Sequence, residues 1–255
     1  MSESRDMNVG KPPVCLCRRS FLKYTGFGGV MMGTPSVLAQ TSGGNSSPAN
    51  RRGTQPSEAQ IIKPKDAILQ LMTGNQRFVG GLSKPRDFLA QTKALPFNQE
   101  PFAAVLICSD ARVSPEVIFD TGLGELFVVG VAGNIVTPEG LASLEYAVDI
   151  LGVSLIFVLG HTRCGSIETV IEAVKGEREL PGHMGSLVRY IEPAYQKVLK
   201  HEGNLLNNTI SANILLSIEQ LPASSKIISR NLKEETLAIH GGLYDLHSGK
   251  VSLQA

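Results

Sequence analysis

The chain has 255 residues with 24 basic and 23 acidic side chains, so its formal net charge is +1. A charge this close to zero gives no reason to expect a nucleic-acid partner. No stretch approaches the roughly 20 consecutive apolar residues of a membrane-spanning helix, so no membrane span is expected in the mature protein.

Residues 1–39 have the pattern of an export signal. The sequence RRSFLK starts at Arg18, a modestly apolar, glycine-rich run follows it, and Val37-Leu38-Ala39 offers a small-x-small cleavage site. This pattern resembles a twin-arginine signal peptide, which implies passage of the folded protein through the twin-arginine export machinery to the periplasm or another extracytoplasmic place. The alternative is a basic amphipathic helix at the N-terminus.

The cysteines leave two interpretations open. The chain has four of them, at positions 15, 17, 108 and 164, and cleavage after Ala39 would remove the first two. Cys108 and Cys164 could form a disulfide, which an oxidising compartment favours, or they could be metal ligands. Because twin-arginine signals carry folded proteins, a metal site could be loaded in the reducing cytoplasm before export.

The remaining chain reads as a linker followed by one domain. Residues 40–60 are rich in Ser, Gly, Asn, Gln and Pro, and they cannot bury a core. From residue 61 to 255 the apolar pattern is that of one α/β domain. Helices are expected at 64–81, 87–95, 140–152, 166–176, 184–200 and 207–220, and strands at 103–108, 126–131 and 154–160, with two more within 236–254.

The order of these elements predicts an α/β fold. Strands that are apolar on both faces and that alternate with helices are typical of a parallel sheet covered on both sides. We therefore expect a mostly parallel central sheet flanked by helices, with the first two helices forming an N-terminal helical arm.

Polar side chains follow two of the predicted strands. Cys108, Asp110 and Arg112 occupy every second position after the first strand, so strand alternation would turn them to one side. His161 and Cys164 follow the third strand with the spacing H-x-x-C. The carboxyl ends of parallel strands meet at one edge of a sheet, so these groups are expected to lie close together.

One imidazole and two thiolates form a ligand set that suits Zn²⁺. Three protein ligands are typical of catalytic zinc, because the fourth position stays open to water; Asp110 is a possible fourth ligand in a closed form. The simpler interpretations are that each cysteine is a small core residue and that Asp110 and Arg112 form an ordinary salt bridge.

Four segments, CSDARVSPE, GELFVVGVAGN, SLEYAV and VLGHTRCGS, resemble in this order the β-class carbonic anhydrases, and the likeness runs from about residue 61 to 250. The resemblance implies reversible hydration of CO₂ to bicarbonate and a proton by a zinc-bound hydroxide, in a homodimer or larger homo-oligomer. It implies a single Zn²⁺ per chain on Cys108, His161 and Cys164, and a catalytic pair of Asp110 and Arg112. It also implies substrate-binding roles for Gln99, Gly165, Phe127, Ala132 and Tyr146, some of them across a dimer interface.

The sequence departs from the family pattern at Gly130, Val105 and Ala111, and the first two changes bear on inhibition by bicarbonate. Gly130 stands where the family usually has an arginine, and Val105 stands where some members have a tryptophan; in those members the two side chains help to form an inhibitory bicarbonate pocket. We therefore expect no such pocket. A serine between Asp110 and Arg112 is replaced by Ala111, which should matter little.

Two other functions fit parts of the pattern. A relative of the same fold could hydrolyse CS₂ or COS with similar site residues. A non-catalytic zinc or redox protein could use Cys108 and Cys164 alone, but it would need none of Gln99, Asp110 and Arg112.

Overall fold

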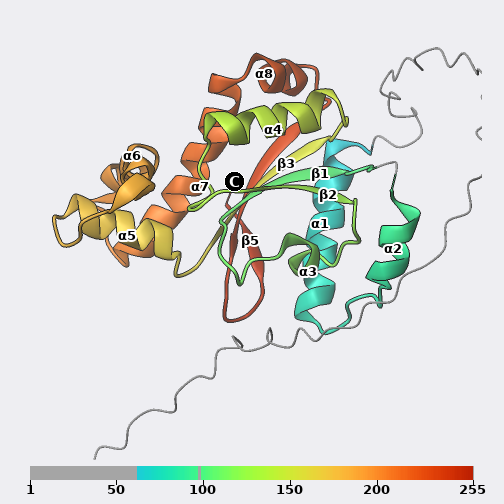
Figure 1. Ribbon diagram of the computed structural model, residues 1–255, viewed down its shortest axis with the longest axis horizontal. Coiled ribbons are helices and arrows are strands. Elements are labelled where there is room, and N and C mark those ends of the chain that lie inside the picture. The colour runs from blue at the N-terminus through green and yellow to red at the C-terminus, as the bar shows by residue number, and fades with distance from the viewer. Residues whose placement is uncertain (1–61, 97–98, 255) are drawn as a thin grey trace, which may run out of the picture. The chain divides into compact units, whose positions relative to one another are not determined.

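The computed structural model describes residues 62–96 and 99–254, which form a sheet with helices on both faces (Figure 1). The predicted signal peptide and linker lie outside the described residues. The helices are α1 (Pro64–Val79), α2 (Phe88–Ala94), α3 (Pro115–Ile118), α4 (Pro138–Asp149), α5 (Gly165–Val174), the 3₁₀ helix η1 (Gly182–Leu187), α6 (Val188–Val198), α7 (Leu205–Ser224) and α8 (Lys226–Lys233). The strands are β1 (Ala103–Ile107), β2 (Leu126–Gly130), β3 (Leu155–His161), β4 (Ala238–Tyr244) and β5 (Val251–Leu253).

The sheet has five strands in the order β2-β1-β3-β4-β5. β1 pairs in parallel with β2 and β3, β3 pairs in parallel with β4, and only β5 is antiparallel. The predicted α/β fold with a mostly parallel sheet is therefore confirmed. The short helices α3 and α8 were not predicted.

Side chains of the central strands alternate between two apolar layers. Ala104 and Leu106 of β1 pack in the core that includes residues of α4, α5 and α7, whereas Val105 and Ile107 pack in the core that includes residues of α1 and α3. Figure 1 shows α4 and α8 on one side of the sheet and α1 and α3 on the other. Burial on both faces explains why β1 and β3 are apolar at nearly every position.

Helix α7 lies directly against the backbone of two strands. A Cβ added at Gly160 of β3 would be 2.6 Å from Cδ1 of Ile214, and one added at Gly241 of β4 would be 2.5 Å from Cγ2 of the same side chain. Both distances are far below a van der Waals contact, so the two glycines permit this close approach. The contact fixes α7 beside Gly160, the residue that precedes His161.

The N-terminal arm packs unevenly. Ala67 and Leu71 of α1 are buried against the sheet, whereas α2, all of which is described, contains no buried residue. Asp120 connects the arm to the body of the domain, because its carboxylate accepts hydrogen bonds from the side chains of Arg77 and Arg86 and from the backbone N–H of Lys84. None of the helices in the described part of the chain combines the length and apolar character that a membrane crossing requires.

Candidate metal centre

Cys108, His161 and Cys164 come together at the carboxyl ends of β1 and β3. These strands are neighbours, with Ile107 opposite Leu159. The ligand atoms of the three residues all lie within 4.8 Å of one another, and the two sulfur atoms are 3.8 Å apart. Cys108 is 3% exposed and the other two are fully buried. The predicted cluster of one imidazole and two thiols therefore exists in the fold.

Local structure sets the direction of each side chain. His161 is the last residue of β3, and Cys164 is the N-cap of α5, so a short turn separates them. Arg163 lies in this turn with a φ of 55°. The turn brings a second ligand back to the strand end from which the first one leaves.

One ring nitrogen of His161 is left without a partner. Nδ1 lies 2.9 Å from the carbonyl oxygen of Thr162, and because a carbonyl can only accept, Nδ1 carries the proton. Nε2 is buried and has no hydrogen-bond partner among the described residues. A neutral imidazole with a buried free Nε2 is the form that binds a metal, and its position beside two sulfurs fits a nitrogen–sulfur ligand set.

Cys108 and Cys164 are free thiols in this structure. The hydrogen bond from the Cys164 thiol, together with the one from the Gly133 N–H, lowers the pKa of Cys108 to about 4. The same contact and the burial of the side chain raise the pKa of Cys164. One thiolate therefore forms readily, and a cation between the sulfurs is needed to hold both side chains as thiolates. This chemistry favours a metal site over two inert core cysteines.

Asp110 and Arg112 contact each other through a turn. The prediction that they share one side because they alternate along a strand was therefore wrong, because neither residue belongs to β1. β1 already ends at Ile107, and the Val113 N–H donates to the Asp110 carbonyl oxygen at 3.0 Å. Arg112 Nε donates to Asp110 Oδ1 at 2.8 Å, and Nη2 donates to Oδ2 at 2.7 Å. These bonds from Arg112 hold the pKa of the Asp110 carboxyl well below its usual range.

The carboxylate of Asp110 faces the cluster while Arg112 holds it. Asp110 Oδ2 lies 3.8 Å from Nε2 of His161. The Asp110 side chain is 17% exposed and that of Arg112 is 55% exposed. An ionised acceptor is thus fixed beside the candidate ligands, and its counter-ion lies on the solvent side.

The other predicted site residues fall into two groups. Ala132 precedes Gly133, whose N–H donates to Cys108 Sγ, and Gly165 is the first residue of α5, directly after Cys164. A Cβ at Gly165 would have no neighbour within 4 Å, so its backbone is open to a small ligand. These two positions lie at the cluster.

Gln99, Phe127 and Tyr146 lie elsewhere in a single chain. Gln99 is exposed and precedes the amino end of β1. Phe127 lies opposite Ala104, which is four residues before Cys108 and hence about 13 Å along the strand. The rings of Phe127 and Tyr146 are 6.1 Å apart. One chain alone does not bring this group to the cluster, and its substrate-binding role stays a prediction.

Gly130 and Val105 offer no polar group at the positions noted above. Val105 is fully buried in the apolar core, and Gly130 is exposed at the end of β2. A Cβ at Gly130 would meet only Ser109 Oγ and Ile107 Cγ1, at 3.6 and 3.9 Å. The absence of an inhibitory bicarbonate pocket stays a prediction.

Sequence reasoning missed two polar residues of α7 near the cluster. Asn213 Nδ2 donates to the Gly133 carbonyl at 2.8 Å, and Ser217 Oγ donates to the Asn134 carbonyl at 3.2 Å. Both side chains are buried. No motif marks them; the only signal in the sequence is a row of polar residues one turn apart, Thr209, Asn213 and Ser217.

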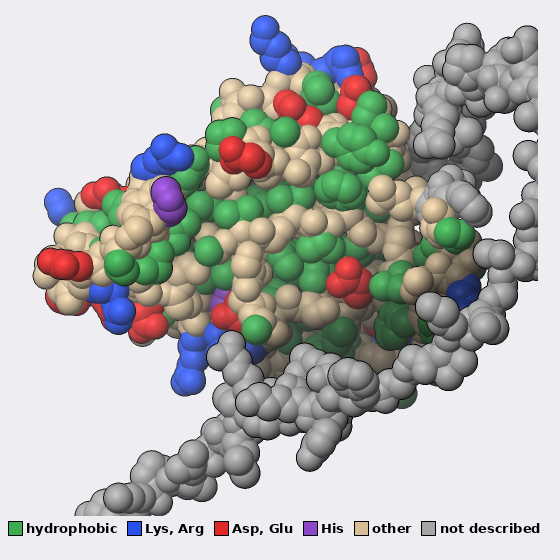
Figure 2. Space-filling model, viewed as in Figure 1, with side chains coloured by type: hydrophobic (Ala, Val, Ile, Leu, Met, Phe, Trp, Pro, Cys, Tyr) green, Lys and Arg blue, Asp and Glu red, His purple; other side chains and the backbone are tan. Residues whose placement is uncertain are grey.

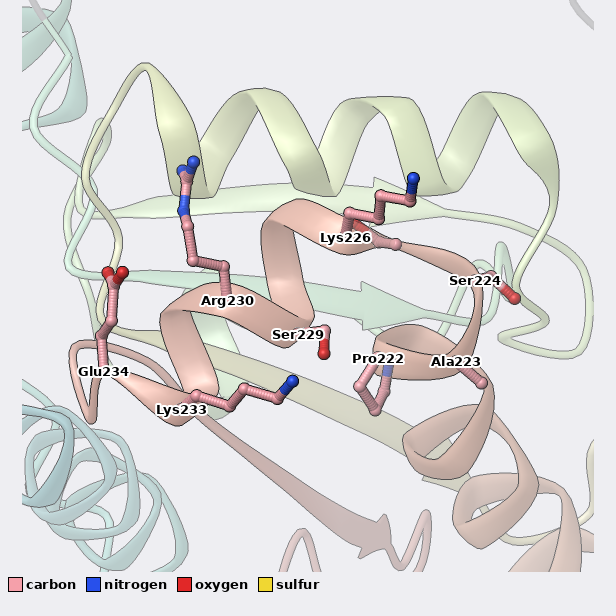
Figure 3. Close-up of a pocket in the computed structure, with 9 residues that line it drawn as sticks. Pro222, Ala223, Ser224, Lys226, Ser229, Arg230, Lys233 and Glu234 are labelled. Carbon is pink, nitrogen blue, oxygen red and sulfur yellow. The ribbon is translucent and has the colours of Figure 1, made fainter.

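A pocket of about 540 Å³ lies at the junction of α7 and α8, away from the cluster. In Figure 3, Lys226 and Arg230 point toward α4, whereas Lys233 extends in another direction. The pocket is at the amino end of the sheet, because α8 leads into β4, and it is lined by none of the predicted site residues.

Comparisons with known proteins show which family the chain resembles. The family model of carbonic anhydrases matches residues 103–251. A carbonic anhydrase of Mycolicibacterium smegmatis is 35% identical over 194 residues, which cover 75% of this chain and 94% of the relative. The structure of the β-carbonic anhydrase CcaA is 30% identical, covers 74% of this chain and 87% of its own, and has a TM-score of 0.58. One of two tetrameric β-carbonic anhydrases from Sordaria macrospora shares the fold at 20% identity, covering 74% of this chain and 96% of its own, with a TM-score of 0.57. The chain therefore belongs to the β-class carbonic anhydrase family of enzymes.

Proposed function

We propose that this chain is a zinc-dependent carbonic anhydrase that interconverts CO₂ and water with bicarbonate and a proton. The observation that carries the proposal is the buried cluster of Cys108, His161 and Cys164, in which Nε2 of His161 has no partner among the described residues. Two thiolates and one imidazole are a zinc ligand set that leaves one position open for catalysis.

The chain's own residues hold the metal and prepare it for reaction. The two thiolates balance the charge of the cation, and the Thr162 carbonyl fixes the tautomer and orientation of His161. When bound, zinc supplies a Lewis acid that activates water near neutral pH.

Asp110 and Gly165 act on the reactants. Arg112 keeps the Asp110 carboxylate ionised and directed toward the cluster, so it can accept a hydrogen bond from the reacting water and orient it. The N–H of Gly165 belongs to the first turn of α5, where N–H groups have no partner within the helix. This positive helix end favours the negative charge that develops on bicarbonate.

The activity is tested with CO₂, COS and CS₂ on one preparation of the full chain. Stopped-flow measurement of proton release should show CO₂ hydration, and sulfide release from COS and CS₂ should be negligible. Preferential sulfide release would assign the chain to a hydrolase of the same fold. No turnover of any of the three by zinc-loaded protein would leave a non-catalytic metal or redox protein.

We also propose a homo-oligomer, because an apolar surface surrounds the outer strand β2. Val128 of β2 is 37% exposed, and Tyr146 and Ile150 at the end of α4 are 45% and 54% exposed. Phe88 and Leu89 of α2 are 48% and 65% exposed. Figure 2 shows hydrophobic side chains spread over the face of the molecule that carries α4 and β2.

A second copy of the chain explains the position of Gln99, Phe127 and Tyr146. These residues lie away from the cluster of their own chain. Phe127 and Tyr146 lie on or beside the exposed apolar surface, and Gln99 is exposed before β1. Association through β2, α2 and α4 can bring them to the site of the partner, as the family resemblance implies. The tetrameric assembly named for the Sordaria macrospora relative is consistent with such association.

Charged substitutions on this surface should separate the chains. We expect the wild type to sediment as a dimer or larger assembly, and Val128→Glu combined with Ile150→Glu to sediment as a monomer that keeps zinc but hydrates CO₂ poorly. Leu253→Glu is the matched control, because Leu253 is 50% exposed on β5 at the opposite edge of the sheet. A fully active wild-type monomer would contradict the proposal.

We further propose that the chain is exported in folded form. Replacing Arg18 and Arg19 with lysine should keep the unprocessed protein in the cytoplasm, because a twin-arginine signal depends on the arginine pair. Fractionation and immunoblotting would follow the precursor and the mature form. Mature protein outside the cytoplasm with both arginines replaced would exclude this route.

A further inference from the structure

We propose that Asn213 is a positioning residue of the metal centre, which acts by holding Gly133 so that its N–H donates to Cys108. This inference rests on the proposed metal site and adds to it a polar contact from a helix that carries no ligand. The evidence consists of the hydrogen bonds of Gly133 and Asn213, the burial of these contacts, and the backbone conformation of Gly133 and Asn134.

The first step is the contact between Gly133 and Cys108. The Gly133 N–H donates to Cys108 Sγ at 3.3 Å, and this contact is buried. A donor to a metal-binding sulfur fixes the direction of its lone pairs and withdraws electron density from it. The strength of the sulfur as a ligand therefore depends on where the Gly133 peptide lies.

The loop that carries this N–H has an unusual backbone. Gly133 has a φ of 79° and Asn134 a φ of 44°, so two consecutive residues lie in the left-handed region. Asparagine adopts this conformation more readily than other non-glycine residues, but it still costs conformational energy that surrounding contacts must offset. A Cβ at Gly133 would also be 2.9 Å from Cδ1 of Ile191, so a side chain does not fit there.

Two side chains of α7 supply the contacts that hold the loop. Asn213 Nδ2 donates to the Gly133 carbonyl at 2.8 Å, and Ser217 Oγ donates to the Asn134 carbonyl at 3.2 Å. The N–H and C=O of Gly133 flank the same Cα, so fixing the carbonyl restricts the rotation that directs the N–H. Asn213 and Ser217 are 1% and 2% exposed, so little water competes for these bonds.

The position of Asn213 is itself fixed from the strand that carries His161. Its neighbour Ile214 packs against the backbone at Gly160, immediately before His161. One helix contact therefore sets the distance between the β3 ligands and the loop that supports the β1 ligand. This arrangement assigns Asn213 a role in the ligand geometry as well as in packing.

The test uses the full-length chain with its metal replaced by Co²⁺, whose sulfur-to-cobalt charge-transfer band reports on the thiolates. Asn213→Leu keeps a similar volume but removes the donor. We expect the band to move to longer wavelength, because the sulfur regains electron density. We expect metal affinity measured against a chromophoric chelator to fall about 10- to 100-fold, because the direction of the Cys108 side chain is no longer fixed.

Asn75→Ala is the matched control. Asn75 is also buried, and it donates to the carbonyls of Ile118 and Gly249 and accepts from the Val251 N–H, but it lies in α1 on the other face of the sheet. This variant should lower the free energy of unfolding without moving the band or the affinity. Ser217→Ala, which removes the second and longer bond, should move the band in the same direction as Asn213→Leu but less.

The outcomes separate this inference from the proposed function. A wild-type chain that binds no cobalt through sulfur would overturn the metal site and this inference with it. A wild-type chain that hydrates CO₂ and shows the band, but whose band and affinity are unchanged by Asn213→Leu, would overturn this inference alone. If Asn213→Leu does not fold, Asn213→Ala, which also lacks the amide donor, takes its place, and an unmoved band and affinity in that variant would overturn it equally.

Discussion

Replacing Cys164 with serine is expected to abolish zinc binding and CO₂ hydration together. Cys164 supplies one of the three candidate ligand atoms, is fully buried and lies directly before α5. A hydroxyl is a much weaker zinc ligand than a thiolate. Loss of a residue that only supports a ligand typically costs 10- to 100-fold in affinity or activity, so the loss of a ligand should cost more than about 100-fold.

The measurement is zinc per chain by elemental analysis beside the CO₂ hydration rate of the same sample. Cys17→Ser is the matched control, since Cys17 lies in the predicted signal peptide and should not change either value. Full zinc content and full activity in Cys164→Ser would exclude Cys164 as a ligand.

Arg112→Ala is expected to keep zinc and to lose most of the activity. Arg112 supplies no ligand atom, but its guanidinium holds both oxygens of Asp110 at 2.8 and 2.7 Å. Asp110 Oδ2 already lies 3.8 Å from His161 Nε2. Without Arg112, the carboxylate can turn toward the cluster and close the open position. The expected loss is about 10²- to 10⁴-fold, the usual contribution of a positioned acid–base group.

Asp110→Asn should also keep zinc and lose activity, because an amide has no ionised acceptor for the reacting water. Arg178→Ala is a suitable control for the loss of an arginine, since Arg178 pairs with Glu172 on the surface. Loss of zinc in Arg112→Ala, or unchanged activity with zinc bound, would contradict the assigned role.

The sequence predicts the sheet and the cluster for the same physical reason. β1 and β3 are buried on both faces, so they are apolar throughout, and a cysteine and a histidine at their ends are conspicuous against that pattern. Because parallel strands end at one edge of a sheet, the sequence could predict that Cys108 and His161 lie close together without knowledge of the strand order. The order β2-β1-β3 then placed the two ligand strands side by side.

Other features depend on contacts that spacing does not encode. Asp110 and Arg112 meet through a turn, and β1 ends at Ile107, five residues before the end of the strand that alternation up to Arg112 required. Asn213 contacts Gly133, which is 80 positions away in the sequence, and no local pattern predicts a contact between residues so far apart. The predicted substrate-binding roles of Gln99 and Phe127 depend on a partner chain, whose position the sequence does not encode.

The ends of helices also depend on contacts that the sequence pattern does not encode. The pattern predicts a helix over 207–220, whereas α7 continues to Ser224 with Pro222 inside its last turn. Ser225 then has an extended backbone and its side chain accepts from the Ile228 N–H, so it starts the separate helix α8. A proline close to a helix end and a capping serine are both local signals, but which of them ends the helix depends on packing.

Titration of zinc into metal-free full-length protein tests the central claim most directly. Zinc is removed with a chelator, returned in increments, and CO₂ hydration is measured by stopped flow at each increment. If Cys108, His161 and Cys164 form the catalytic zinc site, the rate should rise in proportion to bound zinc and stop rising at about one ion per chain, the capacity of a single three-ligand site. Hydration that persists without metal, or its absence at full zinc occupancy, would contradict the account.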